Sequence, residues 1–87
     1  MTPEIRDSLE VAVPEHILPG LQRYVEHHIE PGGFLRAVLE NDLKEAFGRA
    51  DEEARLGMFH IVCWLYNIAP SDCWGSPAKV KAWLREG

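Results

Sequence analysis

The segment from residue 51 to residue 69 constrains the fold more than any other part of the sequence. Asp51 is of a type that caps helix N-termini, and two acids, Glu52 and Glu53, follow it in the turn where the helix dipole favours negative charge. The pattern ends at Pro70, which cannot continue a helix. The run between these marks, MFHIVCWLYNI, is apolar almost all round. Since such a helix belongs in the middle of a bundle, we expect residues 51–69 to form a central helix.

Helical periodicity also runs through the rest of the chain, and prolines and glycines mark its breaks. No segment alternates as a pair of strands would. Further helices are expected at residues 3–10, from a start between Pro14 and Pro19 to His28, at residues 33–48, and after Ser76-Pro77. Thr2 is the expected N-cap of the first helix, and Gly87 marks the end of the last. The sequence therefore predicts an all-α fold, a compact bundle of four to five short helices around the 51–69 helix.

Each expected helix has an apolar face that should join a common core. The face of the second helix consists of Leu21, Tyr24, Val25 and His28. The face of the 33–48 helix consists of Leu35, Val38, Leu39, Leu43, Ala46 and Phe47. The last helix adds Val80, Trp83 and Leu84.

Length and composition indicate one globular domain over residues 1–87, with residues 1–13 as a more loosely attached segment. Apolar residues make up 46% and charged residues 26% of the chain, a balance that opposes disorder. The longest apolar run, residues 61–66, is too short to cross a bilayer. The N-terminal MTPEIRDSLE has neither a basic nor an apolar region of a secretory signal, so a cytoplasmic location is expected.

In that compartment Cys63 and Cys73 are expected as reduced thiols, with a disulfide between them as the alternative. The net charge of −5 opposes binding to nucleic acid and to anionic membranes, because both would be repelled. A basic protein partner or a small ligand is compatible with it.

The stretches PGGFLRAVLENDLKEAFGRAD and WLYNIAPSDCWGSPAKVKAWL resemble a group of small proteins that bacteriophage and prophage genomes encode. The shared pattern is PGGFL-x-AVL-x-NDL, RAD, WLYN-x-AP and CWGSP-x-KV-x-AW, and it covers residues 31 to 84. The group has no assigned activity, so the resemblance implies an origin rather than a reaction. It implies a phage accessory protein of the bacterial host cytoplasm, which inhibits a host enzyme or neutralises a defence system.

Asp42 is the most unexpected residue, because it interrupts the apolar face of the predicted 33–48 helix. A carboxylate there needs a donor, since burial of an unpaired charge costs several kcal/mol. Asp42 either accepts hydrogen bonds within the core, with the 70–76 loop as the expected donor, or anchors a ligand or partner, or acts as a catalytic acid. Asn41 beside it is either a surface residue or offers both donors and acceptors to the same bound group.

Gly32 and Gly33 precede this helix and allow two interpretations. They permit a chain reversal after residues 28–30. Alternatively, the free N–H groups of the helix start, with Arg36 in its first turn, bind a phosphate or carboxylate. The Lys and Ser/Thr of a phosphate-binding loop are absent, so the first interpretation is favoured.

His60, Cys63 and Asn67 share one side of the central helix. With His16, His27, His28 and Cys73 as further ligands they would suit a metal, but their spacing matches no zinc template, so no metal and no cofactor are expected. A Cys–His nucleophile pair is unsupported for the same segment, because a buried Cys on an apolar helix is inert. We expect His60 and Asn67 to hydrogen-bond neighbouring helices.

The loop from residue 69 to residue 77 carries Trp74, which either closes the end of the core or presents its ring at an interface. Tyr66 would join the same surface. Lys79, Lys81 and Arg85 are expected on a solvated face of the last helix.

Two classes of function are consistent with these features. The first is a non-enzymatic protein that binds and modulates a host protein, as an oligomer or through a Trp/Tyr surface. The second is an oligomeric protein that sequesters a small anionic ligand such as a nucleotide signal, in a site between subunits. No constellation for an enzyme is visible. The candidate ligand- or partner-binding residues are Gly32, Gly33, Arg36, Asn41, Asp42, Tyr66, Asn67, Trp74 and Ser76.

Overall fold

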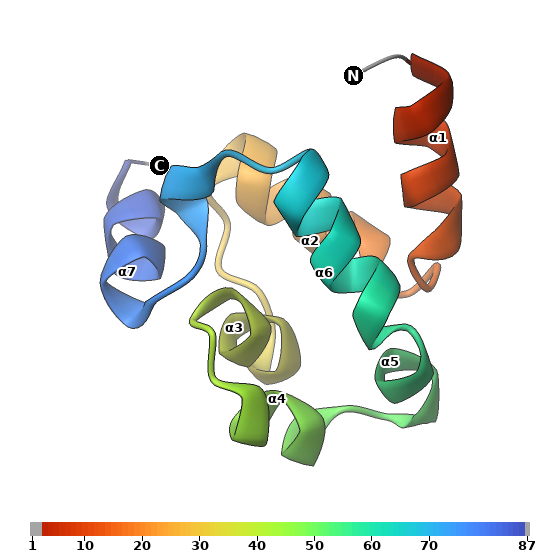
Figure 1. The fold of residues 1–87 in the computed structure, drawn as a ribbon. Coiled ribbons are helices and arrows are strands. Elements are labelled where there is room, and N and C mark those ends of the chain that lie inside the picture. The colour runs from red at the N-terminus through yellow and green to blue at the C-terminus, as the bar shows by residue number, and fades with distance from the viewer. Residues whose placement is uncertain (1–2, 87) are drawn as a thin grey trace.

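The computed structural model describes residues 3–86, and within that range the chain is entirely helical apart from its connections. Figure 1 shows the elements in order, and their bounds are α1 (Pro3–Ala12), α2 (Leu18–His27), α3 (Gly33–Leu39), α4 (Leu43–Arg49), α5 (Glu52–Leu56), α6 (Met58–Asn67), the 3₁₀ helix η1 (Ser71–Cys73) and α7 (Pro77–Arg85). The predicted all-α bundle is confirmed. The expected Thr2 cap and the helix end at Gly87 lie outside the described residues.

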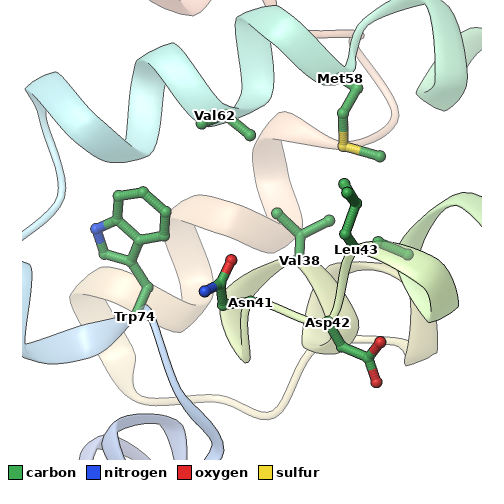
Figure 2. Close-up of a pocket in the computed structure, with 8 residues that line it drawn as sticks. Val38, Asn41, Asp42, Leu43, Met58, Val62 and Trp74 are labelled. Atoms are coloured by element: carbon green, nitrogen blue, oxygen red, sulfur yellow. The ribbon is translucent and has the colours of Figure 1, made fainter.

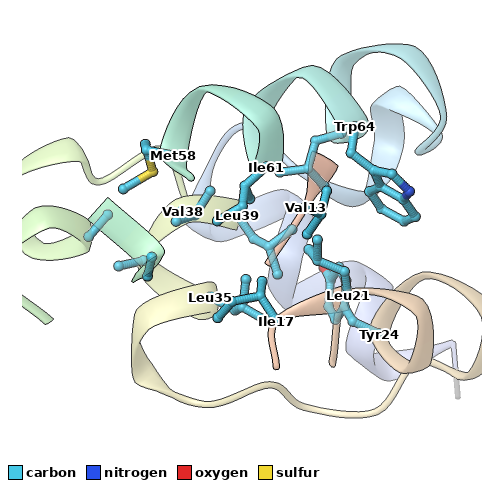
Figure 3. Packing of buried hydrophobic residues seen from close by; sticks show 14 of the residues in the cluster. Val13, Ile17, Leu21, Tyr24, Leu35, Val38, Leu39, Met58, Ile61 and Trp64 are labelled. Carbon is cyan, nitrogen blue, oxygen red and sulfur yellow. The ribbon is translucent and has the colours of Figure 1, made fainter. Parts of the chain in front are cut away.

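The core lies between α6 on one side and α2 and α3 on the other. Figure 3 shows Ile61 and Trp64 of α6 facing Leu21 and Tyr24 of α2 across this core. All four side chains are at most 1% exposed. The shared core also includes the buried residues Val13, Ile17, Leu35, Ala37, Val38, Leu39, Ala46, Ala54, Met58, Leu65, Cys73 and Val80.

The predicted 33–48 helix is wrong in one respect, because it is broken into α3 and α4. Asn41 lies at the break with a φ of 62°, in the left-handed region that Asn tolerates better than most residues. Asp42 follows as the N-cap of α4, and its Oδ1 accepts a hydrogen bond from the backbone N–H of Glu45 at 3.2 Å. The break changes the direction of the chain, so α4 does not continue the buried face of α3. Leu43 is therefore 69% and Phe47 42% exposed, where burial was predicted.

The predicted 51–69 helix is also broken, at Gly57. Asp51 caps α5 as expected and accepts from the backbone N–H of Ala54 at 2.7 Å. The chain then packs closely against the α1–α2 connection, since a Cβ atom at Gly57 would lie 2.5 Å from Pro14 Cγ and 2.8 Å from its Cδ. Only a glycine permits this approach without a shift of the backbone.

The second half of that segment, α6, is apolar almost all round but only partly covered. Met58, Ile61, Trp64 and Leu65 are buried, whereas Phe59, Val62 and Tyr66 are exposed. The Cα atoms span 31 × 28 × 17 Å, and 17 Å accommodates two layers of helices packed about 8–10 Å apart. A helix in a two-layer bundle has one face without a neighbour, so the prediction of a helix covered all round is wrong for α6 in a single copy.

Candidate functional site

An apolar groove lies where the turn between α3 and α4 faces α6. It has a volume of about 100 Å³ and is lined by Val38, Asn41, Asp42, Leu43, Ala46, Met58, Val62 and Trp74. Figure 2 shows Leu43 reaching toward Met58 across the groove, with the Trp74 ring closing one end. Six of these eight residues are apolar, so the groove can hold an apolar group that is no larger than an aliphatic side chain.

The two polar residues of the groove have different roles. The Asp42 carboxylate points away from the groove in Figure 2 and caps α4, so its donor is a backbone group of its own helix. The prediction of Asp42 as a core residue bonded by the 70–76 loop is therefore wrong. The Asn41 amide points toward the space between Trp74 and Val38, and its side chain is in none of the side-chain hydrogen bonds found among residues 3–86. Asn41 is the polar group that the groove offers to a bound molecule.

Two hydrogen bonds fix the main chain on either side of Trp74, at Cys73 and at Gly75. The Gly75 N–H donates to the carbonyl oxygen of Leu39 at 2.7 Å, which ties the loop to the end of α3. The Tyr24 hydroxyl donates to the carbonyl oxygen of Cys73 at 2.6 Å, and burial raises the pKa of that phenol above its usual value. Trp74 itself is half-buried against the core, so it serves both as core packing and as an accessible wall.

A second set of contacts fastens α7 to α2 and so fixes the far side of the same loop. The Nδ1 atom of His28 lies 2.7 Å from the carbonyl oxygen of Trp83, and because a carbonyl can only accept, Nδ1 carries the proton. The Trp83 Nε1–H donates to the carbonyl oxygen of Tyr24 at 2.9 Å, and the His28 and Trp83 rings are 4.4 Å apart. We call Tyr24, His28, Cys73 and Trp83 the α2–α7 network.

A second hollow, of about 320 Å³, lies on the other side of Trp74. Tyr66, Ala69, Ser71, Gly75 and Lys79 line it together with that ring. The Lys79 Nζ donates to the carbonyl oxygen of Ser71 at 3.2 Å, and no carboxylate of residues 3–86 pairs with it. Lys79, like Lys81 and Arg85, is exposed as predicted, and it also lines a hollow that contains two aromatic rings.

The predicted anion site at the start of α3 is not part of either hollow. Arg36 forms ion pairs with Glu30 and with Glu40, and the hydrogen bond to Glu40 is the main reason that its pKa is raised. Gly33 lies against the Arg49 side chain, since a Cβ there would be 2.9 Å from Arg49 Nη1. The charge of Arg36 is already compensated, so Gly32, Gly33 and Arg36 do not join Asn41 and Asp42 in one site.

The other predicted site residues have local roles. The Asn67 side chain donates to the Cys63 carbonyl within α6, and His60 is exposed, so the predicted bonds to neighbouring helices are wrong. Ser76 caps α7 and accepts from the Lys79 N–H at 3.2 Å, with Pro77 as the first helical residue, as expected.

Both cysteines are free thiols. Cys73 is fully buried, and this burial raises the pKa of its thiol to about 11. It is therefore protonated and unreactive at neutral pH.

An acidic end of the molecule lies away from the groove, around His16. Its Nε2 is 3.0 Å from Asp51 Oδ2 and its Nδ1 is 3.3 Å from Glu53 Oε2. The Ala54 N–H, and then His16, lower the pKa of Asp51. Among residues 3–86 no group of three or more His, Cys, Asp and Glu side chains is arranged to hold a metal ion.

Sequence reasoning named Asn41, Asp42 and Trp74 of the groove and Tyr66 of the second hollow as candidate site residues. It missed Leu43, Met58 and Val62 as groove residues. Leu43 carried a signal, because Asp42-x-x-Glu45 has the spacing of a capping box that starts a new helix. Met58 and Val62 lie in a run of apolar residues, and nothing in the sequence distinguishes them from their neighbours as groove residues.

No family model, curated protein or solved structure matches the chain. In the part of the chain that the structure describes, no helix is long and apolar enough to span a membrane.

Proposed function

We propose that the protein acts by binding another protein, as a small phage-type accessory protein that docks on a host protein and modulates it. The apolar groove between α4, α6 and Trp74 is the observation that supports this proposal most. The bacterial host as the source of the partner follows from the resemblance to phage-encoded proteins. Inhibition of a defence system is one form that this modulation takes.

The groove has the composition of an interface centre. Its rim presents Leu43, which is 69% exposed, and Val62, which is 38% exposed, and Trp74 forms one wall. Protein interfaces concentrate their binding energy in a few such residues around a pocket that takes an apolar anchor of the partner. The Asn41 amide can hydrogen-bond the main chain next to that anchor.

The groove favours binding over catalysis. Its one titratable side chain, Asp42, points away from the space that a bound group would occupy. The Asp42 carboxylate already accepts a hydrogen bond from the Glu45 N–H. Neither a histidine nor a cysteine lines the groove, so no pair of a nucleophile and a base faces a bound molecule there.

The experiment is affinity capture from bacterial host lysate with matched variants. Leu43→Glu places a charge at the rim of the groove without disturbing the core, because the side chain is mostly exposed. Val11→Glu makes the same change on α1, where Val11 is 85% exposed. We expect a stoichiometric host protein to bind the wild type and the Val11 variant and to be lost from the Leu43 variant. A captured protein that the Leu43 variant also retains would contradict the groove as the docking site.

The second hollow supports the alternative function, sequestration of a small anionic ligand. Tyr66 and Trp74 line it with aromatic rings on which an aromatic group can pack. The Lys79 ammonium, which forms an ion pair with no carboxylate of residues 3–86, offers a charge to a phosphate or carboxylate. Its volume of about 320 Å³ is within the range of ligand sites. Thermal melting with a panel of nucleotides tests it, since a ligand that binds only the native state raises Tm. A shift for the wild type and Lys81→Gln, but not for Lys79→Gln, would support it, and no shift with any nucleotide would refute it.

A further inference from the structure

The apolar groove and the second hollow are neighbours on the surface of the protein. Trp74 forms a wall of both spaces. Val62 lines the groove and Tyr66 lines the hollow, and these two residues lie one turn apart on α6, with Cβ atoms about 5–6 Å apart. Side chains two residues apart on one face of an extended segment are about 7 Å apart. One short segment of a partner can therefore fill both spaces.

The second hollow offers hydrogen-bond donors, and no Asp or Glu side chain lines it. The first donor is the Lys79 ammonium. The second is the Trp74 Nε1–H, which is in none of the side-chain hydrogen bonds found among residues 3–86. Figure 2 shows this nitrogen on the edge of the ring away from the groove. A carboxylate is the side-chain group that both accepts hydrogen bonds and carries the charge opposite to that of lysine.

The Lys79 side chain is held over the loop instead of extending into solvent. Its Nζ donates to the Ser71 carbonyl at 3.2 Å, and its stem passes Gly75, where an added Cβ would lie 3.9 Å from Lys79 Cδ. Gly75 has a φ of 118°, a conformation that favours glycine. The ammonium thus has a defined position, and two of its three N–H donors are left for a bound group.

The charge of the protein is unevenly distributed, and the second hollow lies at its basic end. Residues 69–87 contain three of the nine basic and two of the fourteen acidic side chains, so they carry a net charge of +1, whereas residues 1–68 carry −6. Charges more than about 8 Å away are largely screened in physiological salt, so the charge near the hollow governs which group binds there. Asp72 of the same loop does not line the hollow.

Other hollows of the protein would repel an acidic group. The hollow around His16 is lined by Glu15, Asp51, Glu52 and Glu53, and one beside α1 by Asp7, Glu10 and Glu15. An acidic side chain of a partner is therefore attracted to the hollow at Lys79 and repelled from these two.

We propose that the groove and the second hollow form one peptide-binding site, in which an aliphatic side chain of the partner enters the groove and an Asp or Glu side chain two to four residues away enters the second hollow. Asn41 hydrogen-bonds the main chain of the segment beside the groove. This inference rests on the proposed binding of a host protein and specifies the segment that is recognised. It also assigns the second hollow to that protein in place of a free small ligand.

Selection of peptides from a display library tests this inference. The immobilised full-length protein selects from random nonapeptides. We expect enrichment of peptides that carry Leu, Ile, Val or Met with an Asp or Glu two to four residues away. Lys79→Glu should keep the aliphatic preference and replace the acid by Lys or Arg, and a Glu three residues after the cap Ser76 also suits the start of α7. Lys81→Glu is the matched control and should select the same peptides as the wild type.

Fluorescence anisotropy with a labelled synthetic peptide of an enriched sequence measures the two contacts separately. Replacing the acid of the peptide by its amide should weaken binding to the wild type roughly two- to fivefold, the effect of an exposed ion pair. The same replacement should have no effect on binding to Lys79→Gln, because the charge it pairs with is already absent. Leu43→Glu should weaken binding about tenfold or more, since the aliphatic side chain loses its apolar pocket. Circular dichroism checks that every variant keeps its helix content.

The outcomes separate this inference from the proposed function. A library that yields no enriched peptide, enriched peptides that lack an acid, or an unchanged acid preference in Lys79→Glu would overturn the two-part site. A free nucleotide that raises the Tm of the wild type but not of Lys79→Gln would assign the hollow to a small ligand and also overturn it. In capture from host lysate, a protein lost from Leu43→Glu but retained by Lys79→Glu would leave docking at the groove standing and refute only the recognition of an acid.

Discussion

Asn41 and Asp42 act as a pair that ends one helix and starts the next. Asn41 takes the left-handed conformation that stops α3, and Asp42 supplies the cap that starts α4. An acid that looked misplaced on an apolar helix face is thus exposed and bonded to the Glu45 N–H. Asp42 affects the groove only indirectly. The helix break that it caps places Leu43 at the groove instead of in the core.

Replacing Asp42 tests this capping role. Asp42→Ala should lower the free energy of unfolding by about 0.5–2 kcal/mol, since the Glu45 N–H loses its acceptor. Asp42→Asn should cost much less, because the Asn side chain also accepts from the helix start. Urea denaturation of both variants measures the difference. Equal losses for Ala and Asn would show that the charge, rather than the cap, is required.

Gly57 is required for a different physical reason, the approach of Pro14. Gly57→Ala should lower the free energy of unfolding by about 1–3 kcal/mol, because the added methyl group collides with the proline ring. Gly48→Ala is the matched control, since a Cβ there meets nothing within 4 Å. Gly48 lies inside α4, where alanine is the better helix former by about 0.5–1 kcal/mol. Thermal unfolding should therefore shift in opposite directions for the two variants, and a shared direction would contradict the steric explanation.

At the scale of elements, local sequence signals predicted the caps but not the breaks. Asp51 and Ser76 act as N-caps where they were expected, because a cap depends on residues within one turn. The breaks at Asn41 and Gly57 were missed, since the apolar periodicity continues across both. Because the chain turns at Asn41, residues after it no longer lie on the helix face that the periodicity of residues 33–40 predicts. Leu43 and Phe47 are therefore exposed. The groove followed from these breaks, so it could not be predicted from a model of two long helices.

The α2–α7 network is also invisible in the sequence, because its members are far apart along the chain. Tyr24→Phe should cost about 1–3 kcal/mol in the free energy of unfolding, since it leaves the buried Cys73 carbonyl without its donor. Tyr66→Phe is the matched control and should be neutral, because Tyr66 is 78% exposed. Guanidinium denaturation measures both. A neutral Tyr24 variant would mean that the Cys73 carbonyl finds another donor.

For the whole molecule, the buried Cys73 thiol predicts a loss of stability in alkali. The unfolded thiol loses its proton near pH 9, whereas the folded one does so near pH 11. Between these values the unfolded chain binds fewer protons than the native one, so the free energy of unfolding falls as pH rises. We expect a steeper fall from pH 9 to pH 11 for the wild type than for Cys73→Ala, measured by urea denaturation at each pH. Parallel curves would show that the thiol does not contribute.

The all-α class was predictable because it depends on periodicity summed over the whole chain, whereas the two-layer thickness was not. Thickness depends on how many helices the chain can stack, and seven short helices within residues 3–86 form only two layers. The apolar sequence of α6 predicts a helix that is covered on every side, but a bundle of two layers leaves Phe59, Val62 and Tyr66 exposed.

The hydrogen bonds that hold the loop around Trp74 have a consequence for sequence change. In the α2–α7 network and in the bond that Gly75 donates, every acceptor is a main-chain carbonyl, that of Leu39, Cys73, Tyr24 or Trp83. Main-chain oxygen persists whatever side chain its residue carries, so the residues at positions 39 and 73 can drift among apolar types of similar size without loss of these bonds. The donors Tyr24, His28 and Trp83 have no such freedom, because each supplies the bond from its own side chain. Related chains that share this fold should therefore retain the three donor residues more strictly than the cysteine they surround.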